Sequence, residues 1–168
     1  MVETGVNYGI SSAFILQALE DNGEGRLYSI DLPRAEYRTP GCNSHSDWRI
    51  SQSLPPGFVI PVEIRDRWRL SLGDSKIQLP RLLDRIDAID FFYHDSKHTY
   101  EHMMFEYETI LPHLKDSGIV GSDDITWNGA FDEFCLRHQL VTYKRFRQGF
   151  AVHSQADPQA TLGQSRLG

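Results

Sequence analysis

Cysteines, long apolar runs and basic charge are all scarce in this sequence, and each scarcity excludes a class of protein. The 168 residues include two cysteines, Cys42 and Cys135, far apart and without a CxxC partner. This excludes a disulfide scaffold and indicates reduced thiols in a cytosolic protein. No apolar run approaches the roughly 18 residues of a membrane span, and no charged-then-apolar leader precedes the first expected strand. We therefore expect no membrane partner and a cytoplasmic location.

Acidic residues outnumber basic ones, 23 against 17, which gives a net charge of −6. This balance argues against nucleic acid as a partner. The length suits one domain with a real core. We expect that domain to span residues 1–154 and to be followed by a polar, disordered tail over residues 155–168.

Short apolar runs alternate with helical patterns, which predicts an α/β fold with a parallel sheet wrapped by helices. The expected strands are 2–4, 26–31, 68–74, 88–95 and 118–124, and the expected helices are 11–20, 61–67, 75–85, 99–114 and 130–138. The breaker-rich residues 32–60 are expected to form a loop. Residues 142–154 are expected to form an antiparallel hairpin that turns at Gln148-Gly149.

Acidic residues stand where the expected strands end: Glu3, Asp31, Asp74, Asp95, and the pair Asp123 and Asp124. Each alone has an ordinary explanation as a turn or helix-capping residue, and Asp74 before a helix fits capping especially well. Ligands of open parallel sheets bind outside the carboxyl ends of the strands. Together the strand ends therefore indicate a site along one edge of the sheet.

The stretch VETGVNYGISSAF, residues 2–14, predicts a strand, a glycine turn and a helix. Glycines in such a turn let the backbone approach a ligand closely. Gly5 and Gly9 are spaced GxxxG, which differs from the GxGxxG spacing of dinucleotide-binding turns. A carboxylate such as Asp31 can accept hydrogen bonds from both ribose hydroxyls. The expected ligand is therefore a nucleoside with a small anionic group.

Four segments carry a family resemblance: ETGVNYGISS, SIDL, IDFFYHDSKHTYEH and LPHLKDSGIVGSDD. They resemble the class I S-adenosylmethionine-dependent methyltransferases, in the group of O-methyltransferases related to sugar and macrolide methyltransferases. The resemblance covers about residues 2–127. It implies a Rossmann-like three-layer sandwich whose mostly parallel, seven-stranded sheet ends in an antiparallel hairpin. The implied activity is O-methylation of a small hydroxylated acceptor, a sugar or natural product.

The resemblance also implies which residues contact S-adenosylmethionine. By position, the methionine part of the cofactor would contact Glu3, Gly5 and Gly9, with Ser11 nearby. The ribose would contact Asp31, and the adenine would lie beside Asp74 and Ser75.

The resemblance further implies a catalytic and metal-binding group. In metal-using relatives, acids at the positions of Asp95, Asp123 and Asp124 hold Mg²⁺, and a histidine at the position of His98 is the general base. Carboxylate oxygens suit this hard cation, which would orient the acceptor hydroxyl and lower its pKa. A histidine can then take the proton.

Several alternatives remain at this point. His94, His98 and His102 recur every four residues, which would suit a transition-metal site, and the Asp123-Asp124 pair could be a simple turn. Trp48 and Trp127 would shape an acceptor pocket if they lie near the same edge. The rival functions are a nicotinamide-dependent oxidoreductase, against which the GxxxG spacing counts, and a non-catalytic scaffolding domain.

The family usually carries helices before the first strand, and none precedes residue 2 in this sequence. We expect a trimmed fragment, a minimal protein, or a protein completed by homo-oligomerisation. Apolar surface left uncovered on the first strand and helix would favour a partner.

Overall fold

The computed structural model describes residues 1–33 and 54–153. Most of the expected loop 32–60, with Cys42 and Trp48, and the expected tail 155–168 lie outside the described residues. None of the described helices has the length and apolar composition that a membrane crossing needs.

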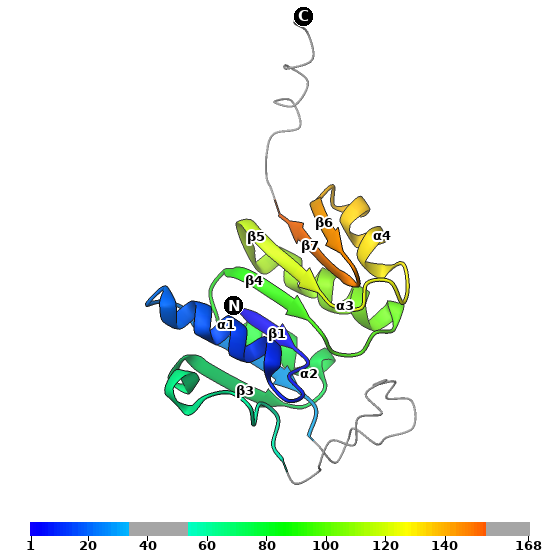
Figure 1. Ribbon diagram of the computed structural model, residues 1–168. Coiled ribbons are helices and arrows are strands. Elements are labelled where there is room, and N and C mark those ends of the chain that lie inside the picture. Colours follow the sequence, from blue (N-terminus) through cyan, green and yellow to red (C-terminus); the bar gives the residue numbers. More distant parts are fainter. Residues whose placement is uncertain (34–53, 154–168) are drawn as a thin grey trace, which may run out of the picture.

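In the described part of the chain, one seven-stranded sheet has the strand order β3-β2-β1-β4-β5-β7-β6 (Figure 1). Its strands are β1 (Val2–Thr4), β2 (Leu27–Asp31), β3 (Trp68–Leu72), β4 (Ile89–His94), β5 (Leu114–Ser122), β6 (Val141–Arg145) and β7 (Gln148–Val152). The first five strands pair in parallel, and β5, β7 and β6 pair antiparallel. The expected mostly parallel sheet with an antiparallel C-terminal hairpin is confirmed.

Helices cover the sheet from both faces, which gives the expected three layers (Figure 1). They are α1 (Ile10–Asp21), α2 (Ser75–Leu83), α3 (Tyr100–Ile110) and α4 (Ala130–Arg137), with short 3₁₀ segments η2 (Val62–Arg67) and η3 (Leu111–His113). On one face, α1 and η2 bury a small cluster that includes Leu16 and Ile64. On the other, α2, α3 and α4 bury a larger core that includes Leu79, Tyr107 and Phe134.

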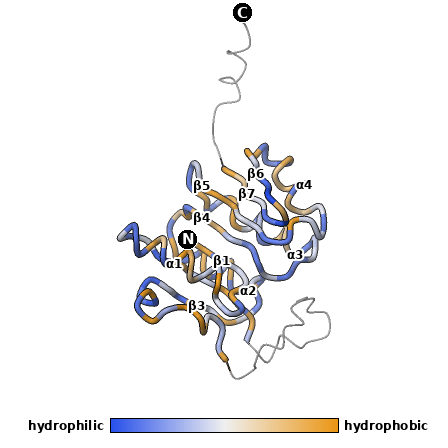
Figure 2. The backbone as a smooth tube through the Cα atoms, in the orientation of Figure 1, coloured by the Kyte–Doolittle hydropathy of each residue, from blue (hydrophilic) through white to orange (hydrophobic). Residues whose placement is uncertain are grey.

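The hydrophobic pattern explains this layering. The central strands carry buried apolar residues, whereas the end of α1 near Asp21 is hydrophilic (Figure 2). Apolar strands buried on both faces are typical of parallel sheets, because crossover helices cover both sides. The order of elements therefore follows from the alternation of apolar and amphipathic segments.

Expected boundaries differ most from the structure at the hairpin turn and around the start of β5. The hairpin turns at Phe146 and Arg147, not at Gln148-Gly149, because β6 ends at Arg145 and β7 begins at Gln148. Gly149 lies inside β7, where an added Cβ would lie 2.6 Å from the Phe131 ring. The glycine thus meets a packing requirement and not a turn. The expected helix 99–114 ends at Ile110, and β5 begins at Leu114.

The strand order reverses between β1 and β4, and the glycine turn begins at this point. Gly5 follows β1 with φ +85°, and a Cβ on it would lie 1.9 Å from the backbone oxygen of Asp95, just after β4. Backbone cannot yield as a flexible side chain can, so only glycine fits. The turn is thereby held against the end of β4.

Gly5→Ala is expected to destabilise the fold far more than Gly23→Ala. Gly23 also has positive φ, +75°, but nothing lies within 4 Å of its added Cβ. Both variants suffer the left-handed strain of about 1–2 kcal/mol, and Gly5→Ala adds a clash of about 1–3 kcal/mol. Urea unfolding of both variants measures the difference. Equal losses would contradict the close approach of the two strand ends.

Candidate active site

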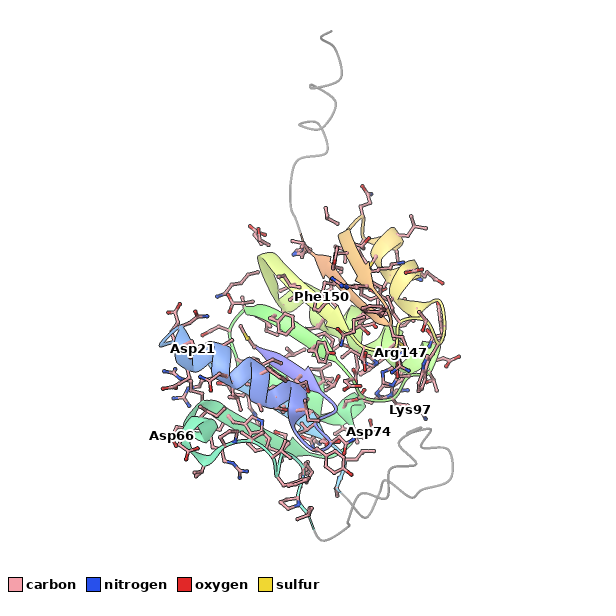
Figure 3. All side chains as sticks on the ribbon, viewed as in Figure 1. Asp21, Asp66, Asp74, Lys97, Arg147 and Phe150 are labelled. Carbon is pink, nitrogen blue, oxygen red and sulfur yellow. The ribbon has the colours of Figure 1, made fainter. Side chains whose placement is uncertain are left out.

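The expected site residues lie along the edge of the sheet where the parallel strands end. Asp74, Lys97 and Arg147 mark this side of the molecule, whereas Asp21 and Asp66 lie on the opposite side (Figure 3). Strand order reverses at the same edge, which is where open α/β sheets bind ligands.

Asp31 at the end of β2 is bonded to the glycine turn. Its Oδ2 accepts hydrogen bonds from the backbone N–H groups of Val6 at 3.2 Å and Asn7 at 2.8 Å, and its Oδ1 accepts one from Leu32. The carboxylate is therefore fixed between the end of β2 and the turn after β1. A ligand with two adjacent hydroxyl groups would meet a fixed acceptor there.

Glu3 in β1 is fully buried beside the first turn of α1. Its carboxylate accepts hydrogen bonds from the hydroxyl groups of Ser11 at 2.6 Å, Ser12 at 2.6 Å and Ser29 at 2.8 Å. Burial raises its pKa, and the three hydroxyl groups oppose that rise. The structure thus brings Glu3 and Ser11 together as expected, and their contact with a ligand stays a prediction.

Asp74 and Ser75 stand at the end of β3 and the start of α2. Asp74 caps the helix, since its side chain accepts a hydrogen bond from the Lys76 N–H at 2.9 Å. The Gly73 N–H donates to the Asp31 carbonyl at 2.8 Å, which joins the ends of β2 and β3. Ser75 is buried, and its hydroxyl lies 2.9 Å from Nε2 of His102. The pair therefore lies at the expected edge, with Asp74 also serving as a cap.

Asp95 follows β4 and faces other carboxylates. Burial and the negative charges of Asp123 and Glu3 raise the pKa of Asp95 to about 8. Its Oδ1 lies 3.7 Å from Nε2 of His98, so these two expected catalytic residues are brought together. This crowding favours the protonated form of Asp95, and a nearby cation would favour the ionised form.

The side chain of His98 is largely buried, with 8% of it exposed, which favours the neutral imidazole. Burial and the proximity of His94 lower the pKa of His98 to about 3. Its ring centroid lies 5.1 Å from that of Trp127, which is 40% exposed. A neutral imidazole can accept a proton, and Trp127 gives the edge an apolar surface beside it.

The three acids expected to hold Mg²⁺ do not form a metal site as placed. Asp124 adopts positive φ, 46°, and its Oδ1 lies 3.2 Å from Nε of Arg147. The Ile125 N–H donates to the Arg147 carbonyl, which holds the hairpin turn beside Asp124. Within residues 1–33 and 54–153, no three metal-ligating side chains lie close enough to share an ion. The donors are of the right chemistry, but Arg147 is paired with one of them.

Sequence reasoning missed Glu106, Arg147 and the roles of two histidines. Glu106 in α3 is fully buried, and both His94 and His102 contact its carboxylate. The histidine repeat thus belongs to a carboxylate network. A signal existed, because Glu106 lies three residues after Met103 and four before Ile110, on the apolar face of its helix. Arg147 belongs to a basic stretch that was expected on a solvated strand face, because the turn was expected two residues later.

Comparison with known families settles the class of protein. Residues 2–125, well over half of the chain, match a family described as a methyltransferase domain. The chain belongs to this family. The expected methyltransferase class of enzyme is confirmed. The match supports neither the oxidoreductase nor the scaffolding alternative. A comparison with curated protein sequences found no match.

Solved structures share the fold at low identity. CalS11, a TDP-rhamnose 3'-O-methyltransferase of calicheamicin biosynthesis, is 19% identical with a TM-score of 0.63, over 94% of this chain and 72% of CalS11. TomG, an O-methyltransferase from Streptomyces achromogenes solved with S-adenosylmethionine, is 14% identical with a TM-score of 0.64, over 91% and 72%. MycE of the mycinamycin pathway, solved with Mg and S-adenosylhomocysteine, is 16% identical with a TM-score of 0.59, over 94% and 46%. The Rossmann-like methyltransferase fold is confirmed.

Asp95→Asn is expected to stabilise the protein, increasingly at higher pH. The folded pKa of Asp95, about 8, exceeds its ordinary value of 3.8, so the folded state binds more protons than the unfolded state between those values. The stability of the parent protein falls as pH rises through that window. The asparagine variant does not lose this stability, because its side chain does not ionise. Thermal unfolding at about pH 5 and about pH 8.5 measures the difference. Asp66→Asn, on the opposite side of the molecule, is the control (Figure 3). A gain independent of pH would contradict the charge crowding.

Proposed function

We propose that this methyltransferase transfers the methyl group of S-adenosylmethionine to a hydroxyl group of a small acceptor, a sugar or natural product. The observation that carries the proposal is the Asp31 carboxylate bonded to the glycine turn at the reversal of strand order. Support for the acceptor class comes from the fold shared with CalS11 and TomG. The residues therefore fit a nucleoside cofactor held along the edge of the sheet.

Three strand ends would hold the cofactor. Asp31 would accept hydrogen bonds from the ribose hydroxyls, and Gly5 and Gly9 would let the methionine part approach the turn. Glu3 and Ser11 would lie beneath that part. Asp74 and Ser75 would lie beside the adenine, since the Gly73 N–H ties their segment to the carbonyl of Asp31. Bound there, S-adenosylmethionine supplies an electrophilic methyl group.

The end of β4 would receive the acceptor. The acceptor oxygen would form a bond to the methyl carbon while the carbon–sulfur bond breaks, and the hydroxyl proton would pass to Nε2 of His98. Asp95, at 3.7 Å, would stabilise the imidazolium that forms once its own carboxyl group is ionised. Trp127 would pack on the apolar face of the acceptor. Most of the rate would come from positioning, because the transfer is an in-line displacement.

Mg²⁺ is a separate question, because Arg147 pairs with one of its expected ligands. The ion would bind to Asp95, Asp123 and Asp124 only if Asp124 released the guanidinium group of Arg147. The ion would then orient the acceptor hydroxyl. The proposed transfer uses Asp95 and His98 without a step through the metal.

Calorimetric titration with S-adenosylhomocysteine tests the cofactor site. The parent chain is expected to bind, and Asp31→Ala is expected to weaken binding about a hundredfold, because charge-assisted hydrogen bonds to the ribose are lost. NAD is expected not to bind. Asp66→Ala is the matched control, since this exposed carboxylate lies on the opposite side (Figure 3). A parent chain that binds no S-adenosylhomocysteine, or an Asp31→Ala variant that binds within about twofold of it, would contradict the proposal.

Titration with Mg²⁺ tests the competing ion pair. Arg147→Gln is expected to strengthen Mg²⁺ binding about tenfold, because it removes a positive charge 3.2 Å from Asp124. The double variant Arg147→Gln/Asp124→Asn is expected to lose that gain. Arg145→Gln, two residues earlier in β6, is the control. Unchanged Mg²⁺ affinity in Arg147→Gln would show that Arg147 does not compete for this site.

A further inference from the structure

The fully buried carboxylate of Glu106 is the centre of a hydrogen-bond network. Oε2 accepts from the Thr4 hydroxyl at 2.5 Å and His94 Nδ1 at 2.6 Å, and Oε1 accepts from the Ser96 hydroxyl and His102 Nε2, both at 2.9 Å. Four donors fill the acceptor capacity of a carboxylate. Burial alone would raise the pKa of Glu106, but His94 and His102 outweigh it and hold that pKa well below its ordinary value.

One arm of the network reaches His98. His94 and Thr4 face each other across β4 and β1, and both side chains point to Glu106. A carboxylate only accepts, so the hydrogen of the His94 contact belongs to Nδ1, which fixes the ring. That ring meets His98 edge-to-face with centroids 5.1 Å apart. Among the described residues, Nε2 of neither ring makes a hydrogen bond.

The other arm reaches the expected cofactor side. His102 Nε2 lies 2.9 Å from the Glu106 carboxylate and 2.9 Å from the Ser75 hydroxyl. Ser75 begins α2, three residues after the last residue of β3. Glu106 thus contacts, through one histidine each, the two parts of the edge that the proposed function assigns to proton transfer and to the adenine.

We propose that Glu106, His94 and His102 form a positioning unit that holds His98 through one histidine and Ser75 through the other. The inference rests on the proposed function, because it takes His98 as the proton acceptor and Ser75 as a cofactor neighbour. A charged carboxylate without exposure is costly unless fully bonded, and a packed apolar residue would serve the core as well. The network therefore does more than stabilise the fold. It fixes the positions of His98 and Ser75 through one buried carboxylate.

His94→Asn and His102→Asn in the full chain separate the two arms. His94→Asn keeps a donor at the position of Nδ1 but removes the ring that packs on His98. It is expected to speed carbethoxylation of His98 by diethyl pyrocarbonate about tenfold, read by mass spectrometry, and to leave S-adenosylhomocysteine affinity within about twofold. His102→Asn is too short to reach Ser75. It is expected to weaken S-adenosylhomocysteine binding about tenfold and to leave His98 reactivity unchanged.

His102→Gln is the rescue variant, because its amide nitrogen replaces Nε2 and can donate to both Glu106 and Ser75. It is expected to restore S-adenosylhomocysteine binding. If both asparagine variants lower only the melting temperature, with His98 reactivity and ligand affinity unchanged, the network is structural and the inference is overturned.

Two further measurements distinguish failure of the inference from failure of the proposed function. If His94→Asn does not fold, nitrogen NMR of the parent chain decides that arm: hydrogen at Nδ1 of His94 supports it, and hydrogen at Nε2 alone overturns it. Failure of the proposed function would instead appear in the parent chain, which would then bind no S-adenosylhomocysteine, and the inference would fall with it. Failure of the inference alone appears in the variants, or in the His94 tautomer of the parent chain, while the parent chain still binds S-adenosylhomocysteine.

Discussion

The buried carboxylate of Glu106 is the interaction on which the arrangement of this edge depends. It draws donors from β1, from β4 and the residues that follow it, and from its own helix, and through His102 it reaches the start of α2. Leaving a buried charge with any donor missing would be costly, so these elements are constrained to one mutual position. The site is therefore placed by a polar interaction within an otherwise apolar core.

Charge is distributed unevenly across the site. Glu106 is matched by donors and has a lowered pKa, whereas Asp95 faces other carboxylates and has a raised one. Arg147 compensates Asp124 from the hairpin turn. This contrast separates an interior carboxylate that is matched by donors from a strand end where carboxyl groups crowd one another. A carboxyl group with a strongly raised pKa at a strand end is typical of a functional site, because stability alone would not retain it.

Particular elements show which parts of the structure could be predicted from the sequence. The alternation of apolar and amphipathic segments predicted the parallel sheet and its helices, since burial on both faces leaves that pattern. The position of the hairpin turn was wrong because Gly149 is required by the Phe131 ring 2.6 Å from its added Cβ, and no local pattern reveals a distant neighbour. The helix from 99 ended four residues early, where Pro112 and a 3₁₀ turn lead into β5. Glu106 was missed because three of its four donors come from two segments outside its own helix.

The sequence by itself determined the class of fold, the edge at which acids gather, and the methyltransferase family, because strand ends and short motifs are local. The tertiary structure decided which of those acids are bonded inward, which are crowded and which are paired with a cation. Glu3 is bonded to serines, Asp95 is crowded by carboxylates, and Asp124 is paired with Arg147. These differences depend on distances between segments far apart in the chain, which a one-dimensional pattern does not contain.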